Sequence, residues 1–532
     1  MNLYPKNIYF VKNKISVENM KKRISIIIFI LIYSSIIFWV SFFSCGINDD
    51  IYDYCDAKAY AVNAATLSRT FESMPIHLLT PYTWDDFVYE KRELGLGSAL
   101  INPGYCIMMA GIYKLIGKCR LLYGSFVSYI FYLFGIIFMI LILSRFFNHK
   151  ELLFCCILIC SSWLIIMNMI RPLSDPVFWG LSLFCIWFSL KYPNKHILIG
   201  AIIGVIFIFR FQGLFLYPLI FILIVQDFSV KVMIKTIVRM SIGAIPFLII
   251  MKLIPLITGQ NVAVQTINAG ATFYLTSYMK LLQNFNFSAY IIKINQSIKK
   301  LSSLNVLTPI FWLLATSIFS PDENKLIIRL RWFCLLGIVS LIVVGSLGNG
   351  PSSRLYLVFF PFVIALSFQF VKTLANNFTA DAKKLITPLI IIFFLFSTSS
   401  GLLSIVACYN KRSDQKFIPA EVWDSFEINL KHFKPDAVIA TNYLELPFFH
   451  ETRNIAILPE NFRSFMNESQ RNHELDGIVF VTYKNRFNHY SSWKSILKQG
   501  NITDKNNNKF IKIFEIVNPL VQIYCYQLML SQ

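Results

Sequence analysis

Long apolar runs alternate with short polar stretches over most of the chain. A transmembrane helix needs roughly 17–25 predominantly apolar residues, and runs of this kind recur between residues 22 and 408. The pattern predicts a polytopic α-helical membrane protein with about 11 transmembrane helices. The predicted spans are 22–45, 122–144, 151–170, 175–191, 196–210, 213–227, 239–257, 304–320, 332–348, 355–371 and 385–408.

Three longer segments lie outside these spans. The first, 46–120, follows the first span, and the second, 260–303, has the amphipathic order of a helix at the membrane interface. The third, 409–532, is more polar and mixes helix-like with strand-like runs. We therefore expect a transmembrane domain over 1–408 and a small α/β domain over 409–532. The strand-like runs are Asp436–Thr441, Gly477–Tyr483 and Phe510–Val517.

The basic residues lie mostly in short loops between the apolar runs. The chain has a net charge of +20 although only 15% of its residues are charged, against about 25% in soluble proteins. Alternate loops are rich in Lys and Arg, which is the positive-inside pattern and predicts a cytoplasmic N-terminus. An odd number of spans then puts the C-terminus, with its α/β domain, on the outer face. Nucleic-acid binding is not expected, because it needs a basic face on a soluble domain.

Cysteine and the N-terminus add little chemistry. The run that follows Lys21, Lys22 and Arg23 is too long for a signal-peptide core, so we interpret it as the first span. The sequence has 11 cysteines without a CxxC pair, and several fall inside apolar spans, so no structural zinc site is predicted. Cys45 and Cys55 flank the acids that follow the first span, and a disulfide between them stays open.

A cluster of acids stands where the first span leaves the membrane. In "DYCDAKAYAVNAATL" (Asp53–Leu67), Asp56 and Tyr60 fall at helical spacing and share one helix face. A carboxylate on an outer loop at the membrane surface is well situated to take a proton from a hydroxyl group. The alternative is that these acids are simply solvated at the membrane exit.

Charged residues also recur at the predicted outer ends of later spans. Arg171 and Asp175 begin one span, Arg210 ends another, and Arg354 stands at the start of a third. Charges at or inside the membrane are costly and are commonly functional. The alternative for a single Arg is that it extends toward lipid headgroups. Several cations with acids in one plane favour a functional site.

These motifs, in this order, resemble the GT-C superfamily of membrane glycosyltransferases. The closest likeness is to the branch of protein O-mannosyltransferases and lipid A aminoarabinose transferases, and it covers most of the chain. The corresponding segments are Asp56-x-x-x-Tyr60-x-x-x-Ala64, the Pro turn and apolar stretch of Asn102–Gly117, Asp175, Arg210–Leu214, Arg354–Pro361 and "ATNYLELPFFHETR" at Ala440–Arg453.

The resemblance implies a GT-C-like fold and an inverting sugar transfer from a polyprenyl-phosphate donor. Asp56 would be the general base, with Asp50 in reserve, and Asp175 would position the acceptor or support the base. A phosphate leaving group needs cations to absorb its charge. The expected phosphate-binding residues are Arg210, Arg354 and Arg171, and the expected substrate-binding residues are Tyr60, Asn102 and Tyr105.

One departure from the family affects cofactor and substrate. Aminoarabinose transferases carry a Glu-Lys pair before the Pro turn, where this chain has Ile101 and Asn102. That metal ligand and that phosphate-binding Lys are therefore not carried over, and lipid A is not implied as the acceptor. The sequence requires no cofactor, assigns no metal ligand and leaves a divalent metal open.

The acceptor is expected to be a hydroxyl of a surface glycan, glycolipid or protein. Richness in Ile, Asn, Lys and Phe indicates an AT-rich genome and favours a bacterial enzyme of the cell inner membrane, for example one modifying lipopolysaccharide O-antigen, although an endoplasmic reticulum location stays open. Three alternatives remain: a lipid-linked saccharide flippase or other transporter, an O-antigen polymerase or ligase, and a structural membrane protein. A transporter would carry paired charges deep in its spans, and a polymerase a catalytic loop late in the chain.

Overall fold

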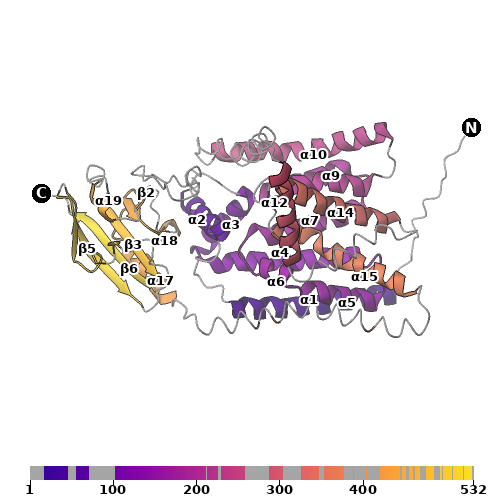
Figure 1. The fold of residues 1–532 in the computed structure, drawn as a ribbon, viewed down its shortest axis with the longest axis horizontal. Helices are drawn as coiled ribbons and strands as arrows, with labels where there is room; N and C mark the ends of the chain where they lie inside the picture. The colour runs from indigo at the N-terminus through magenta and orange to yellow at the C-terminus, as the bar shows by residue number, and fades with distance from the viewer. Residues whose placement is uncertain are drawn as a thin grey trace, which may run out of the picture.

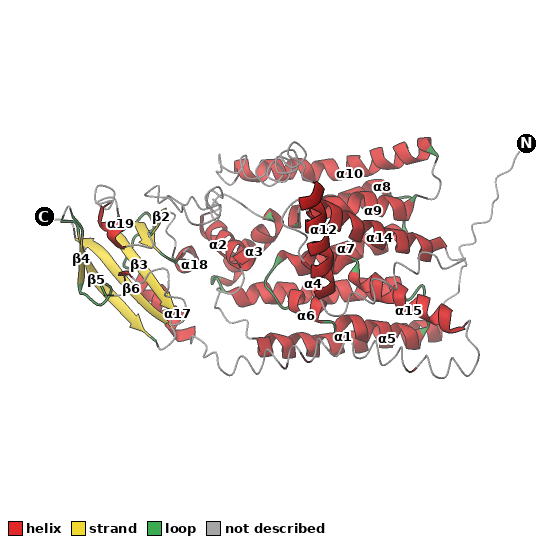
Figure 2. Cartoon of the chain, in the orientation of Figure 1, coloured by secondary structure: helices red, strands yellow, loops and turns green. Residues whose placement is uncertain are grey.

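The structure is a computed structural model, and it combines a bundle of apolar helices with one mixed sheet (Figures 1 and 2). It describes residues 17–45, 55–70, 102–210, 212–225, 229–257, 287–303, 325–346, 353–376, Pro388, Leu403, Val406, 420–443, 446–450, 454–458, 462–467, 475–483, 492–493, 495–505, 507–518 and 521–529.

The helices follow the predicted apolar runs. They are α1 (Val17–Cys45), α4 (Leu121–Leu143), α5 (His149–Cys160), α6 (Trp163–Met169), α7 (Ser174–Lys191), α8 (His196–Phe209), α9 (Gly213–Ile224), α10 (Val230–Ile257), α14 (Lys325–Ser346) and α15 (Phe360–Asn376). Of the helices that the structure describes, α1, α4, α10 and α14 are long and apolar enough to cross a membrane, and the α5–α6 pair would make a fifth. The helical membrane fold is confirmed, whereas the number of about 11 spans stays a prediction.

Two predicted spans differ in detail from simple helices. The run 151–170 is broken between α5 and α6, which meet at a bend of 59°. Ser162 begins the second piece, and its side chain accepts a hydrogen bond from the backbone of Ile165 as a helix cap. The run 355–371 starts as the 3-10 helix η2 (Ser353–Val358) before α15. The predicted spans 304–320 and 385–408 lie outside the described residues, except for three single positions.

Two short helices follow the first span and lie between the bundle and the sheet (Figure 1). They are α2 (Cys55–Thr70) and α3 (Pro103–Ile116), which pack against each other. Gly104, in the first turn of α3, lies so close to α8 that an added Cβ would come within 2.8 Å of the Ile208 side chain. This close approach joins α3 to the bundle. A further helix, α12 (Phe287–Ser303), runs across the direction of the other helices, within the segment expected at the interface.

The C-terminal residues form a six-stranded mixed sheet in the order β2-β1-β3-β6-β5-β4. Its first three strands are parallel, and the remaining pairs are antiparallel. All three strand predictions are confirmed. The strands are β1 (Val438–Thr441), β2 (Asn454–Ile457), β3 (Gly477–Tyr483), β4 (Asn501–Thr503), β5 (Lys509–Val517) and β6 (Val521–Met529), accompanied by the helices α17 (Ala420–Leu430), α18 (Leu446–Phe449) and α19 (Phe462–Asn467).

Both faces of the sheet are covered, and one face packs toward α2 and α3. Along β3, Ile478 and Phe480 belong to one buried cluster, whereas Val479 and Val481 belong to another that also contains side chains of α2 and α3. This alternation is that of a strand buried on both sides, which explains its continuous apolar sequence. The Arg69 side chain of α2 also donates to the main-chain oxygen of His450, at 3.0 Å. The sheet is therefore docked on the two short helices.

Basic side chains at the opposite end of the bundle bind helix C-termini. Arg23 donates to Ser144 O at the end of α4, Arg145 to Leu190 O near the end of α7, and Arg329 to a main-chain oxygen near the end of α9. A helix C-terminus carries partial negative charge, so cations there are stabilising. The charge pattern predicts that the segments which hold these arginines lie on the inner side of the membrane. In the structure the three arginines share one end of the bundle.

Candidate functional site

A buried carboxylate joins two arginines that are far apart in the sequence. Asp175 lies in the first turn of α7, and its side chain is 1% exposed. One carboxylate oxygen pairs with Nη1 of Arg210 at the end of α8. The other lies 3.5 Å from Nη1 of Arg354 on η2. Three residues that the sequence analysis singled out separately therefore form one cluster.

Arg210 is held from three sides. It is the C-cap residue of α8 and has an extended backbone, which directs the chain away from the helix axis. Its Nε donates to Oε1 of Gln212 at 3.0 Å, and its guanidinium lies 5.6 Å from the ring centroid of Phe178. Together with the ion pair to Asp175, these contacts fix the orientation of a guanidinium whose side chain is 7% exposed.

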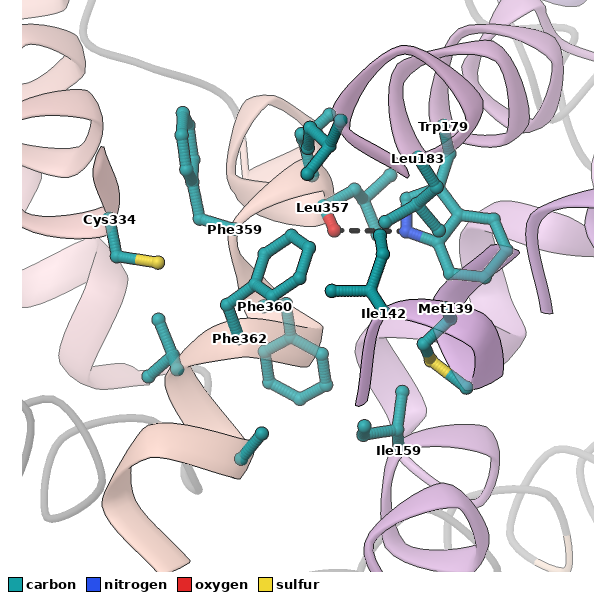
Figure 3. Close-up of a cluster of buried hydrophobic side chains, with 14 of the residues drawn as sticks. Met139, Ile142, Ile159, Trp179, Leu183, Cys334, Leu357, Phe359, Phe360 and Phe362 are labelled. Atoms are coloured by element: carbon teal, nitrogen blue, oxygen red, sulfur yellow. Dashed lines mark hydrogen bonds between the residues drawn. The ribbon is translucent and has the colours of Figure 1, made fainter. Parts of the chain in front are cut away.

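Arg354 is positioned by a hydrogen bond between α7 and η2. The indole N–H of Trp179 donates to the main-chain oxygen of Leu357 at 3.1 Å, deep in the apolar cluster of Figure 3. Trp179 is fully buried, and Gly135 of α4 leaves room for its ring, because an added Cβ would collide with it. Arg354 has 26% of its side chain exposed, so it is the more accessible of the two arginines.

A network of neutral polar groups adjoins the charged cluster. The side-chain amide of Asn102 donates to Tyr60 Oη at 2.6 Å and to Ser174 Oγ at 3.0 Å. Ser174 directly precedes Asp175, and the Tyr60 ring makes an edge contact with Tyr105 at 5.3 Å between centroids. Burial raises the pKa of Tyr105 well above its usual value, and neighbouring Asp175 adds to this shift, so the phenol stays protonated.

Of the other expected site residues, the structure describes Arg171 and the backbone of Asp56 but not Asp50. Arg171 lies in the turn that enters α7, and its main-chain oxygen accepts a hydrogen bond from Ser128 at 2.8 Å. Asp56 belongs to α2, one helical turn before Tyr60, but its side chain is outside the described residues, as is the whole of Asp50. Among the side chains that the structure describes, no three His, Cys, Asp or Glu residues are grouped as metal ligands.

Sequence reasoning missed residues that support the expected site residues. Ser174, Gln212 and Trp179 stand within four residues of a predicted site residue, but nothing in the pattern marks a Ser, Gln or Trp in an apolar span as functional. The spacing to Asp175 is the signal that could have identified Trp179, because a residue one helical turn later lies on the same helix face.

A shallow apolar hollow lies next to the residues that contact Arg210. Phe178 and Gln212, which contact the guanidinium, both line it. Its other walls come from α9, α14 and the segment that follows Arg354. They are Phe215, Leu216, Leu219, Gly337, Ser340, Leu341, Val358 and Phe359. The site therefore combines two cations with an adjoining apolar surface.

Comparison with known proteins defines the fold. No protein-family model and no curated protein matches the sequence. Among solved structures, the oligosaccharyltransferase of Archaeoglobus fulgidus, in complex with Zn and sulfate, aligns at 11% identity with a TM-score of 0.49, over 85% of this chain and 67% of that chain. ArnT from Cupriavidus metallidurans bound to undecaprenyl phosphate aligns at 11% identity with a TM-score of 0.53, over 94% of this chain and 97% of that chain.

The same ArnT in the apo state gives a TM-score of 0.54 at 11% identity, over 93% of this chain and 97% of that chain. The alignment thus extends over nearly the whole of both proteins. At this identity the likeness concerns the fold alone, and the chain has the fold of ArnT. The resemblance found in the sequence motifs is confirmed at that level.

Proposed function

We propose that the protein is an inverting glycosyltransferase that moves a sugar from a polyprenyl-phosphate donor to a hydroxyl group. The observation that carries this proposal is the pair of arginines held by one buried carboxylate at the bundle end next to α2 and α3. The GT-C fold supports it, and so does the binding of undecaprenyl phosphate by a protein of similar fold.

In this proposal Arg210 and Arg354 bind the donor phosphate. Transfer breaks the bond between the anomeric carbon and a phosphate oxygen, so negative charge grows on the leaving phosphate. Two guanidinium groups already oriented by Asp175 stabilise that charge without reorganising during the reaction. Arg171, just before the helix α7 that carries Asp175, is a third cation for the donor headgroup. We propose that the start of the polyprenyl chain lies along the apolar side chains beside Arg210.

We assign the general base to Asp56, with Asp50 in reserve. The carboxylate takes the proton of the acceptor hydroxyl while the hydroxyl oxygen bonds to the anomeric carbon from the side opposite the phosphate. The bond to the phosphate breaks with its electron pair, and polyprenyl phosphate leaves. Asp56 shares α2 with Tyr60, whose hydroxyl takes part in the network that reaches Ser174.

For Asp175 we propose a different role from the one the sequence suggested. Both of its carboxylate oxygens face arginines, and the side chain is almost wholly buried. It therefore orients the phosphate-binding cations rather than the acceptor. Tyr60, Asn102 and Tyr105 form the neutral polar wall next to this cluster. Tyr60 and Tyr105 are almost wholly buried, so we propose that this wall shapes the sugar site from behind.

The topology and the acceptor belong to the same proposal. A bacterial inner-membrane protein with a cytoplasmic N-terminus would expose the site, and a C-terminal domain over 409–532, to the periplasm. The clustering of the inner-loop arginines at the far end of the bundle supports this orientation. The acceptor would be a surface glycan such as O-antigen, a glycolipid or a protein.

Mass spectrometry of surface glycans and lipid-linked sugars tests the function. We would compare wild type, a deletion strain and strains that carry Asp56→Asn or Arg210→Gln at matched protein levels. We expect one sugar to disappear from a glycan, glycolipid or protein in the deletion strain and in both variants, with accumulation of its polyprenyl-phosphate form. Accumulation of complete repeat units on the lipid, or wild-type glycans in the deletion strain, would refute the proposal.

A further inference from the structure

Asn102 has an unusual backbone conformation. Its φ of 57° and ψ of 63° are left-handed, and among the described residues only Asn507 shares a positive φ without being glycine. Asn tolerates this region better than most residues, but the conformation is still strained, and such outliers gather at functional sites. Asn102 is also the N-cap of α3, yet its side chain makes no capping bond. Helix capping therefore does not explain the residue.

The amide of Asn102 instead connects two other helices. Its amide nitrogen donates hydrogen bonds to Tyr60 Oη on α2 and to Ser174 Oγ at the start of α7. Ser174 is fully buried, and Tyr60 is 4% exposed. The link therefore runs through the protein interior, from the helix that carries Asp56 to the helix that carries Asp175.

We propose that Asn102 is a positioning residue that fixes the base helix α2 relative to the two arginines. The inference rests on the proposed function, because it presumes that Asp56 is the base and that the arginines bind phosphate. Displacement of a reacting group by about 1 Å can cost about a hundredfold in rate. A neutral amide can set this distance without adding charge beside the phosphate site.

The structure indicates that the link can be removed without unfolding the site. Tyr60 Oη and Ser174 Oγ already share a long hydrogen bond of 3.4 Å, so neither hydroxyl is left without a partner when the amide is removed. The start of α3 is held independently, because Gly104 packs on Ile208 of α8. Replacement by glycine also relieves the left-handed backbone, whereas replacement by alanine keeps the strain.

Two variants therefore separate the amide from the backbone. Asn102→Gly and Asn102→Ala both lack the amide, and Asn507→Gly is the matched control, because Asn507 is also left-handed but lies in the β4–β5 hairpin. Each would be measured for sugar transfer in cells by mass spectrometry. The purified proteins in lipid nanodiscs would be measured for melting temperature and for affinity toward undecaprenyl phosphate.

We expect both Asn102 variants to lose transfer by about tenfold to a hundredfold, with affinity for undecaprenyl phosphate within about twofold of wild type, because the phosphate-binding arginines are held by other contacts. Asn102→Gly should melt within about 2 °C of wild type and Asn102→Ala at a lower temperature. The Asn507→Gly control should transfer normally.

Normal transfer by Asn102→Gly would overturn the inference and leave the proposed function standing. A loss of transfer that comes with equal loss of melting temperature or of undecaprenyl phosphate affinity would also overturn it, because Asn102 would then be structural or part of the phosphate site. If the deletion strain lacks no sugar, the proposed function fails, and the inference fails with it.

Discussion

Removal of the Asp175 charge should destabilise the protein through Arg210. The Asp175 and Arg210 side chains are 1% and 7% exposed, so Asp175→Asn leaves a buried guanidinium with its main compensating charge removed. Loss of one partner from a buried ion pair typically costs about 3–5 kcal/mol. Arg354 is 26% exposed, and an ion pair open to water contributes about 0–1 kcal/mol. Most of the cost therefore comes from Arg210, and Arg354→Gln should be nearly neutral for stability.

A double-mutant cycle measures this coupling. Asp175→Asn and Arg210→Gln are combined, and the free energy of unfolding is determined in detergent micelles by chemical denaturation. Because a neutral pair replaces a charged one and no buried charge is left unpaired, the double variant should be more stable than the sum of the single effects by about 2 kcal/mol or more. The control cycle uses Glu151→Gln and Lys372→Gln, since Lys372 is 41% exposed and the two side chains lie 2.5 Å apart.

The control pair should couple more weakly than the Asp175–Arg210 pair, because Lys372 is 41% exposed and water screens its charge. A coupling for Asp175 and Arg210 no larger than that of the control would refute the reasoning. It would mean that water reaches the pair, and that Asp175 does not hold the arginines in a preorganised arrangement.

Three further predictions follow from the packing around the site. Trp179→Phe removes the indole donor to η2 and leaves a buried carbonyl unpaired, which should lower the free energy of unfolding by about 1–3 kcal/mol. The KM for the donor should rise with kcat nearly unchanged. An unchanged KM would contradict the role of this hydrogen bond. Gly135→Ala forces a methyl group into Trp179 and should cost about 1–3 kcal/mol in unfolding free energy, whereas Gly111→Ala, with open space around it, should not destabilise. Arg120→Ala breaks an ion pair with Asp424, whose side chain is 50% exposed, so unfolding free energy should change by about 0–1 kcal/mol; a larger loss would mean that this pair holds the sheet to the bundle.

The sequence was sufficient for the classes of element and for the charged residues of the site. Apolar length revealed most helices, and the continuous run at Gly477–Tyr483 identified a strand covered on both faces. Asp175, Arg210 and Arg354 were recognisable because charges at the ends of membrane spans are costly and rarely incidental. Their sequence separation gave no information on mutual contact, which depends on how α7, α8 and η2 pack.

The remaining features depend on tertiary contacts that leave no pattern in one sequence. The 3-10 start of the predicted span at 355–371 is joined to α7 by the Trp179 hydrogen bond, which no periodicity encodes. The left-handed backbone of Asn102 is equally invisible, because Asn before Pro is common in ordinary turns. The break between α5 and α6 has a local signal in Ser162, but a Ser inside an apolar run is not by itself a helix boundary.

Binding of undecaprenyl phosphate to the purified protein tests the central claim most directly. Affinity would be measured in nanodiscs for wild type, Arg210→Gln, Arg354→Gln and Asp56→Asn, with undecaprenol as the matched lipid without phosphate. We predict that wild type prefers the phosphate form, and that each arginine variant weakens it by about 10- to 150-fold, the equivalent of a hydrogen bond to a charged group. Asp56→Asn should bind like wild type, because the base does not touch the phosphate. Equal affinity for undecaprenol, or arginine variants that bind normally, would contradict the account.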